Sequence, residues 1–261
     1  MARAERILRG HRVLLLALVT AMIPLQLAAD QIRVATASNF RAAMVDIATL
    51  FEQESGHEVT LIPGSSGKHY AQIVNGAPFD AFFSADEERP LRLEKAGLAI
   101  AGSRFTYAIG KLVLWSPQAG LVDAQGAVLK GAGFRHLAIA NPDLAPYGRA
   151  AKEVLLSFGL WDEIGDRLVR GENVNQAFQF VHSRNAELGL VAFSQLKAAP
   201  AGGSYWLIPQ QHYRAIEQQA VLLSEKLAAR DFVEFIQSEE SREMIVNHGY
   251  RTVEMKPTHV Q

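Results

Sequence analysis

Short apolar runs alternate with amphipathic stretches along most of the chain. The run at 32–38 is apolar and β-branched, and it is followed by a stretch in which Met44, Ile47 and Phe51 recur at helical spacing. The first pattern is typical of a buried strand and the second of a helix with one buried face. Gly56 then marks the end of that helix.

The same alternation continues to the end of the chain. It predicts further strands at 57–64, 79–85, 111–117, 136–142, 188–194, 205–210 and 218–224, and helices at 68–76, 87–97, after Tyr147, after 172–174 and through 227–250. Strands that alternate with helices predict an α/β fold with parallel sheets. No internal repeat or low-complexity linker is present, so we expect two lobes joined by strand crossings.

The first 29 residues depart from this pattern. A cationic start, an apolar middle and small residues before Asp30 form the layout of a secretory signal peptide. A retained membrane anchor is the competing interpretation. However, the apolar part is shorter than the ~20 residues of a membrane-spanning helix, and Pro24 interrupts it. We therefore expect cleavage near Ala29 and export of a soluble protein.

Composition narrows the class of function. The chain carries 26 basic and 27 acidic residues, a formal net charge of −1, so no basic excess points to nucleic acid. It contains no cysteine, which excludes disulfides, thiolate metal sites and a cysteine nucleophile. Export without cysteine fits a bacterial periplasm.

The turn after the second predicted strand carries the first candidate chemistry. Ser65 and Ser66 lie between two glycines in "LIPGSSGKHY", and Lys68 follows. A nucleotide-binding phosphate loop requires a leading glycine and a hydroxyl after the lysine. Ile62 and His69 occupy those two positions, so the phosphate-loop interpretation is disfavoured.

Three other interpretations of this turn remain. A nucleophile elbow spaces its two glycines symmetrically around the serine, and this turn is one residue short of that pattern. A helix start carries free N–H groups and a partial positive charge, so the turn suits an anion. In the simplest interpretation, Ser65 or Ser66 only caps the helix.

Similar turns elsewhere favour the anion site. "ASNF" places Ser38 and Asn39 at a strand-to-helix turn, "APYG" places Tyr147 at a helix start, and "ENVN" does the same for Val174. Parallel sheets bind ligands at the carboxyl ends of their strands, so two facing lobes would aim four helix starts into one cleft. Such a cleft offers donors and few acceptors. It suits a fully ionised oxyanion and disfavours one that keeps a proton.

At these residues the sequence resembles the periplasmic molybdate-binding proteins of ABC importers, over about residues 30–250. The resemblance is carried by "TASNFRAAMVDIATLFEQESG", "PGSSGKHYAQIVNGAPFDAFFSAD", "ANPDLAPYGRAAKEVL", "GENVNQAFQFV" and "GLVAFSQL". It implies the type II periplasmic-binding-protein fold, in which two α/β lobes crossed by two strands close over molybdate or tungstate. We expect lobe 1 at 30–109 and 223–261, and lobe 2 at 110–222.

The resemblance also implies a set of ligand-binding residues. By position these are Ser38, Asn39, Ser65, Ser66, Tyr147 and Val174, the last through its backbone N–H. The chain departs from one branch of the family, which has a tyrosine donor where this sequence has Ala192 followed by Phe193. We expect the Tyr147 hydroxyl to replace that donor.

The function implied is capture, not catalysis. The protein would bind the anion without cofactor or direct metal ligands, work as a monomer in the periplasm, and deliver its ligand to an ABC permease in the inner membrane. The alternatives are a receptor for sulfate or another oxyanion, and a secreted serine hydrolase that uses Ser65 or Ser66.

The remaining polar residues receive structural interpretations. The acids at 86–88 are expected to be structural or to lie on a lobe surface, Asp143 to fix its loop, and Lys68 to lie at the rim of the site. The histidines at 57, 69, 136, 182, 212 and 248 show no metal-ligand spacing, and we expect each to be solvated. Trp115, Trp161 and Trp206 are expected in the core or in lobe packing.

Overall fold

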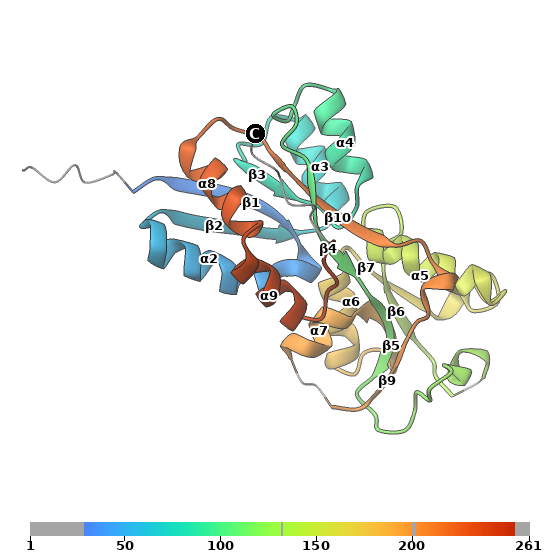
Figure 1. The fold of residues 1–261 in the computed structure, drawn as a ribbon. Coiled ribbons are helices and arrows are strands. Elements are labelled where there is room, and N and C mark those ends of the chain that lie inside the picture. The colour runs from blue at the N-terminus through green and yellow to red at the C-terminus, as the bar shows by residue number, and fades with distance from the viewer. Residues whose placement is uncertain (1–28, 132, 200–201, 254–261) are drawn as a thin grey trace, which may run out of the picture.

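The fold consists of two α/β lobes, each built on one five-stranded sheet (Figure 1). The computed structural model describes residues 29–131, 133–199 and 202–253. The expected signal peptide at 1–29 lies almost entirely outside the described residues. In the part of the chain that is described, no helix has both the length and the apolar character needed to span a membrane.

The first sheet has the strand order β2-β1-β3-β10-β4. Its strands are β1 (Gln31–Ala37), β2 (Glu58–Gly64), β3 (Ala81–Phe83), β4 (Phe105–Gly110) and β10 (Ile216–Leu222). β1 is parallel to β2 and β3, whereas β10 is antiparallel to both β3 and β4. The sheet is therefore mixed, which corrects the expectation of purely parallel pairing.

Helices cover both faces of this first sheet. They are α2 (Arg41–Ser55), α3 (Ser66–Val74), α4 (Glu88–Lys95), α8 (Leu227–Ile236) and α9 (Glu239–Asn247). The predicted apolar stripe of α2, which includes Met44 and Phe51, packs with α8 and α9 into one core, and Ile73 of α3 and Leu93 of α4 belong to a second core. The single long helix expected at 227–250 is broken: α8 ends at Ile236, and Ser238 starts a new helix, since its Oγ caps α9 by accepting from Ser241 N.

The second sheet has the order β7-β6-β8-β5-β9. Its strands are β5 (Leu112–Ser116), β6 (Leu137–Ala140), β7 (Leu168–Gly171), β8 (Leu188–Ala192) and β9 (Ser204–Leu207), and its helices are α5 (Pro146–Ser157), α6 (Val174–His182) and α7 (Phe193–Ala198). Four short 3-10 turns complete the described elements: η1 (Ser38–Phe40), η2 (Ala127–Lys130), η3 (Gly165–Arg167) and η4 (Gln210–His212). Trp115 is fully buried in this lobe and stacks on Phe178, while Trp161 and Trp206 pack against the same core.

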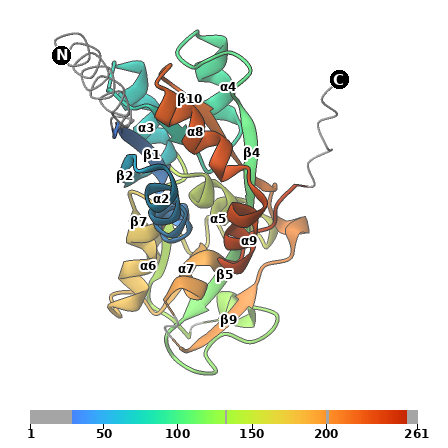
Figure 2. The ribbon, with the colours of Figure 1, turned by 60° about the vertical axis from the view of Figure 1, so that its left-hand side comes forward.

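The chain crosses between the lobes twice. Only Lys111 separates β4 from β5, and residues 208–215 lead from β9 back to β10. Figure 2 shows β4 and β5 continuing from one lobe into the other. The expected second lobe, 110–222, included β10, but this strand is hydrogen-bonded between β3 and β4 and belongs to the first sheet. The return crossing thus precedes Ile216, and no change in composition marks it.

Candidate anion-binding site

A small cavity lies between the lobes where β1 and β2 of one sheet and β6 and β7 of the other end. It has about 190 Å³ of empty space, counting the part open to solvent. It is lined by Ala37, Ser38, Asn39, Gly64, Ser65, Ser66, Ala85, Ala145, Pro146, Tyr147, Asn173 and Val174. All six residues proposed from the sequence are among them. No lining residue carries a formal charge.

The serine turn presents two hydroxyl groups whose oxygens are already engaged. Ser65 is the N-cap of α3, and its Oγ accepts from the backbone N–H of Lys68 at 3.3 Å. Ser66 Oγ accepts from the backbone N–H of Ala85 at 2.9 Å. Since each hydroxyl carries one proton that these bonds do not use, both side chains remain available as donors.

The side chain of Asn39, in the turn after β1, is hydrogen-bonded within the first lobe. The side-chain Nδ2 of Asn39 donates to Gln218 Oε1 at 2.7 Å and to Tyr250 Oη at 3.1 Å. Both amide hydrogens are thereby occupied within the first lobe. What Asn39 retains for an anion is its backbone N–H, because the first N–H groups of a helical segment have no partner within it.

Two helix starts of the second lobe face this serine turn. α5 begins with Pro146 at its first position and Tyr147 next. α6 begins at Val174, after Asn173 caps it by accepting from two backbone N–H groups through Oδ1. Each start provides N–H groups together with the positive end of a helix dipole.

Close backbone packing at these helix starts depends on two glycines. A Cβ at Gly148 would lie 2.4 Å from the carbonyl oxygen of Ala140, so α5 can approach the end of β6 only with glycine there. A Cβ at Gly67 would lie 2.7 Å from Leu144 O, the atom to which the Gly67 N–H donates at 2.9 Å. The second contact joins the two lobes directly at the site.

The Tyr147 hydroxyl is a buried donor without a protein partner among the described residues. The side chain is 1% exposed, and burial raises the pKa of the phenol well above its usual value, so the group stays neutral. The hydroxyl packs against Gly110 at the end of β4, where a Cβ would lie only 2.2 Å away. At the position where one family branch has a tyrosine, Ala192 ends β8, and neither it nor Phe193 lines the cavity.

Charged residues surround the cavity without lining it. Lys68 Nζ pairs with Glu172 at 2.9 Å, and both side chains are about half exposed. Lys68 belongs to the first lobe and Glu172 to the second, so this rim pair spans the cleft. Lys68 therefore lies at the rim of the cavity, as expected, and its ammonium group binds a carboxylate and not a ligand as a phosphate-loop lysine does.

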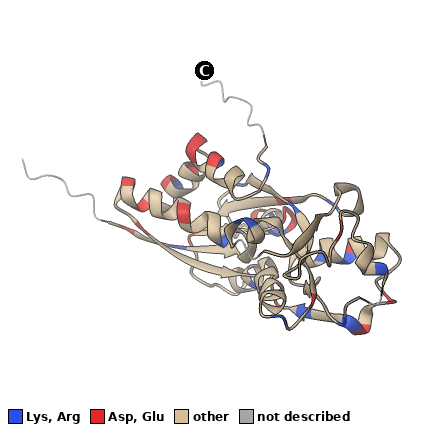
Figure 3. Cartoon of the chain, turned by 90° about the horizontal axis from the view of Figure 1, so that it is seen from below, with Lys and Arg blue, Asp and Glu red and all other residues tan. Residues whose placement is uncertain are grey.

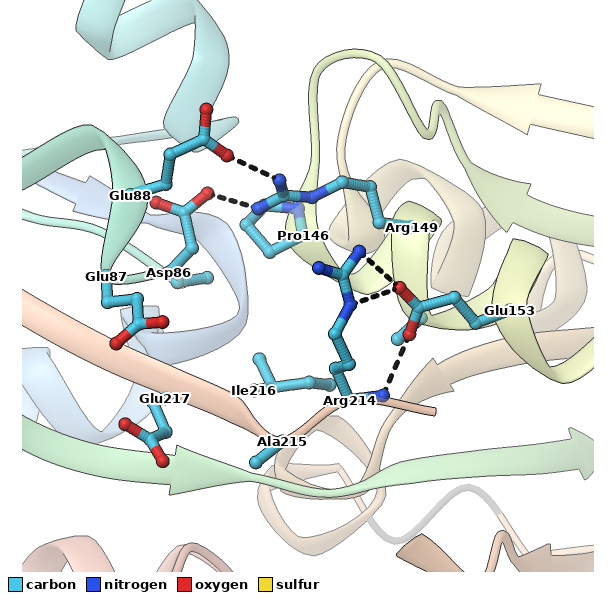
Figure 4. Close-up of a pocket in the computed structure, with 12 residues that line it drawn as sticks. Asp86, Glu87, Glu88, Pro146, Arg149, Glu153, Arg214, Ala215, Ile216 and Glu217 are labelled. Atoms are coloured by element: carbon cyan, nitrogen blue, oxygen red, sulfur yellow. Dashed lines mark hydrogen bonds and ion pairs between the residues drawn. The ribbon is translucent and has the colours of Figure 1, made fainter. Parts of the chain in front are cut away.

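A larger, charged pocket adjoins the cavity and shares Ala85 and Pro146 with it (Figure 4). Arg149 of α5 donates to Asp86 Oδ2 at 2.6 Å and to Glu88 Oε2 at 2.8 Å across the lobe boundary. The Arg149 hydrogen bond is the largest cause of the lowered pKa of Glu88. Asp86 and Glu88, two of the acids expected to be structural or to lie on a lobe surface, therefore join the lobes. Among the described residues, no cluster of histidines and acids could hold a metal ion.

The buried histidines correct one expectation from the sequence. His57 and His69 are buried rather than solvated, at 6% and 2% exposure. His69 packs edge-on against Phe79 and Phe82, and its Nδ1 bonds to Gln72 Oε1 at 3.2 Å. No histidine is hydrogen-bonded to Ser65 or Ser66 in the described structure, so the arrangement gives neither serine a general base.

Comparisons with known proteins agree with this architecture. The sequence profile described as "Bacterial extracellular solute-binding protein" matches residues 32–251. The chain is 47% identical to the molybdate-binding protein ModA of Azotobacter vinelandii over 242 residues, which is 91% of this chain and 96% of the relative. It is 44% identical to ModA of Rhodobacter capsulatus, over 91% and 94% of the two chains.

A solved structure gives the same result for the fold. The periplasmic molybdate-binding protein of Azotobacter vinelandii superposes with a TM-score of 0.83 at 46% identity and covers 85% of this chain and 99% of its own. The chain therefore belongs to the bacterial extracellular solute-binding proteins and, among them, to the family of periplasmic molybdate-binding proteins.

Proposed function

We propose that this protein captures molybdate, and also tungstate, by hydrogen bonds from four helix starts, and delivers the anion to an ABC permease in the inner membrane. It does so as a monomer in the periplasm, exported by residues 1–29, with no cofactor and no catalysis. The relatives named above are molybdate-binding proteins, which supports the ligand class.

The observation that carries the proposal is the state of the two serine hydroxyls. Both oxygens already accept from backbone N–H groups, so both protons are left for a ligand that accepts. Backbone N–H groups at Asn39, Tyr147 and Val174, with the Ser38 side chain and the Tyr147 hydroxyl, complete the donor set. A dianion with four oxygens satisfies such a cavity, whereas a protonated oxyanion brings a donor for which the cavity offers few acceptors.

Neutral donors supply enough free energy for tight binding. A hydrogen bond to a charged group contributes roughly 1.5–3 kcal/mol net. A handful of these bonds supports sub-micromolar affinity even after the cost of ordering two lobes is subtracted. Sulfate is smaller, so it cannot reach all the donors at once, and size supplies the selectivity.

Calorimetric titration with molybdate, tungstate and sulfate tests the proposal. We expect tight, similar binding of the first two anions and weak binding of sulfate. Tight sulfate binding without molybdate heat would replace the proposal with a sulfate receptor. Esterase activity that disappears in Ser66→Ala would instead support a hydrolase.

The Tyr147 hydroxyl is tested separately. The proposal assigns it the donor role that Ala192 does not fill, because the hydroxyl is buried without a protein acceptor. Tyr147→Phe should weaken molybdate affinity by about ten- to hundredfold, the range for one hydrogen bond to a charged group. An affinity within about twofold of the parental protein would remove the hydroxyl from the donor set.

A further inference from the structure

The carbonyl group of Asn39 is held from both lobes at once. Tyr250 Oη, from the segment after α9, donates to Asn39 O at 2.7 Å. Ser194 Oγ, from α7 of the second lobe, lies 3.2 Å from the same carbonyl oxygen and 2.9 Å from Tyr250 Oη. Three residues distant in sequence thus share one set of hydrogen bonds, which we call the Asn39 latch.

The Asn39 latch is shielded from water. Asn39, Ser194 and Tyr250 are 4%, 4% and 3% exposed. In such surroundings water cannot replace a lost hydrogen-bond partner. Breaking one of these bonds therefore costs the full free energy of leaving a buried polar atom unpaired. The carbonyl belongs to η1, the turn that supplies Ser38 and Asn39 to the anion cavity.

Two neighbouring residues of α7, Ser194 and Gln195, bond to different lobes. Gln195 bonds within its own lobe, since its Oε1 accepts from Ala192 N at 3.0 Å and its Nε2 donates to Val174 O at 3.3 Å. Among the described residues, the Ser194 hydroxyl instead bonds only to Asn39 and Tyr250, both of the first lobe. The Ser194 hydroxyl therefore gains these partners when the lobes come together.

We propose that Ser194 and Tyr250 are positioning residues that hold the Asn39 turn in its anion-binding geometry once the lobes have closed, and so slow ligand release. Neither residue lines the cavity, and neither is needed to contact the anion. Ser194 links closure to the turn, and Tyr250 keeps the carbonyl oriented from within the first lobe. The inference rests on the proposed function, because it concerns release of the ligand named there.

Release kinetics distinguish this role from simple packing. Molybdate dissociation is measured by stopped flow in the parental protein, Ser194→Ala and Tyr250→Phe. We expect dissociation to accelerate by about two- to tenfold in each variant, the range for one net hydrogen bond, with little change in the association rate. The double variant should accelerate less than the product of the single effects, because both hydroxyls act on one carbonyl.

A matched control separates closure from stability. Ser116→Ala removes another buried hydroxyl of the second lobe. Ser116 lies at one end of β5, whereas Leu112, at the other end, pairs with Ala192, the residue before α7. Its dissociation rate should equal the parental one. The melting temperature of ligand-free Ser194→Ala should stay close to that of Ser116→Ala, whereas a purely structural serine would lower the melting temperature and leave release unchanged.

The outcomes separate the latch from the proposed function. The titration of the parental protein is carried out first, and release is measured with whichever oxyanion binds. If none of the three anions binds, both the function and the latch are wrong. If the parental protein binds and the variants release at the parental rate, or only as fast as a similarly altered Ser116→Ala, the latch alone is overturned.

Discussion

The two adjoining pockets between the lobes use opposite chemistry. The small cavity is lined by neutral groups, whereas the pocket beside it, about 740 Å³ with its open part, carries Asp86, Glu87, Glu88, Glu153, Glu217, Arg149 and Arg214. They share Ala85 and Pro146, so a few side chains separate the two environments. Elsewhere, acidic and basic positions occur on both lobes (Figure 3).

The difference explains why the proposed anion site would be built from neutral groups. A lysine or arginine in the small cavity would have to be stripped of water each time the lobes closed, at a large cost. Fixed N–H and O–H dipoles need no such reorganisation and leave no charge exposed when the cavity is empty. The formal charges instead join the lobes beside the site, where one end of each pair stays hydrated.

The largest effect is expected from a charge placed in the neutral cavity. Ser66→Asp replaces a donor with an acceptor and adds a negative charge next to the anion. Because one donor alone accounts for about tenfold or more, this variant should lose molybdate affinity by more than about a hundredfold in calorimetry, while Ser66→Ala loses about tenfold. Parental affinity in Ser66→Asp would mean that the side chain does not face the ligand.

The second prediction concerns the charged pocket. Arg149→Gln removes the guanidinium that bridges Asp86 and Glu88 across the lobes. We expect molybdate affinity to fall by about three- to tenfold and to depend less on salt, since a partly buried ion pair is lost. Affinity measured across a series of salt concentrations provides the check.

The same pocket offers a matched control for that arginine. Arg214→Gln breaks the pair with Glu153 of α5, which joins the second lobe to the crossing segment 208–215 and not to the first lobe. It should leave both affinity and salt dependence unchanged. Equal losses in the two variants would show that the pocket acts by its overall charge and not by the bridge between lobes.

A third prediction concerns the pH dependence of stability that follows from His69, a buried residue of α3. Burial lowers the pKa of His69 below 6.5. The unfolded chain therefore binds this proton first as pH falls, and the free energy of unfolding should decrease from about pH 6.5 downward. Thermal unfolding at several pH values checks this, and His69→Gln should flatten the slope there. An unchanged slope in the variant would assign the acid sensitivity to other groups.

The smallest effect is expected at the rim. Lys68→Met breaks the pair with Glu172, which is half exposed on both sides. Exposed pairs contribute at most about 1 kcal/mol, so molybdate affinity should change by less than about fivefold. A loss comparable with that of Ser66→Ala would mean that Lys68 reaches the anion and that the cavity is not built from neutral groups alone.

Local patterns predicted much of the scaffold. The apolar stripe of α2 and the serine turn before α3 follow from spacing and capping chemistry over a few residues. β7 and α7 were not predicted, because their segments LVRG and FSQLKA are short and mix apolar with polar residues, so neither segment forms an apolar run or shows a period. Antiparallel pairing of β10 depends on partners more than a hundred residues away.

The polar contacts of the site were less predictable than its position. That Asn39 lies at a helix start is visible in the sequence, but its bonds to Gln218 and Tyr250 span 179 and 211 residues. The burial of His69 likewise depends on Phe79 and Phe82 folding over it. Spacing rules describe neighbours along a helix or strand and say nothing about such partners.

The position of β10 has a consequence for the order in which the molecule can be assembled. This strand fills the gap between β3 and β4, yet it is synthesised after the whole second sheet. The second lobe can complete its sheet from the continuous segment 112–207, whereas the first has an open seam until residues 216–222 arrive. We therefore expect the first lobe to fold more slowly than the second, because its sheet depends on a contact of long sequence separation.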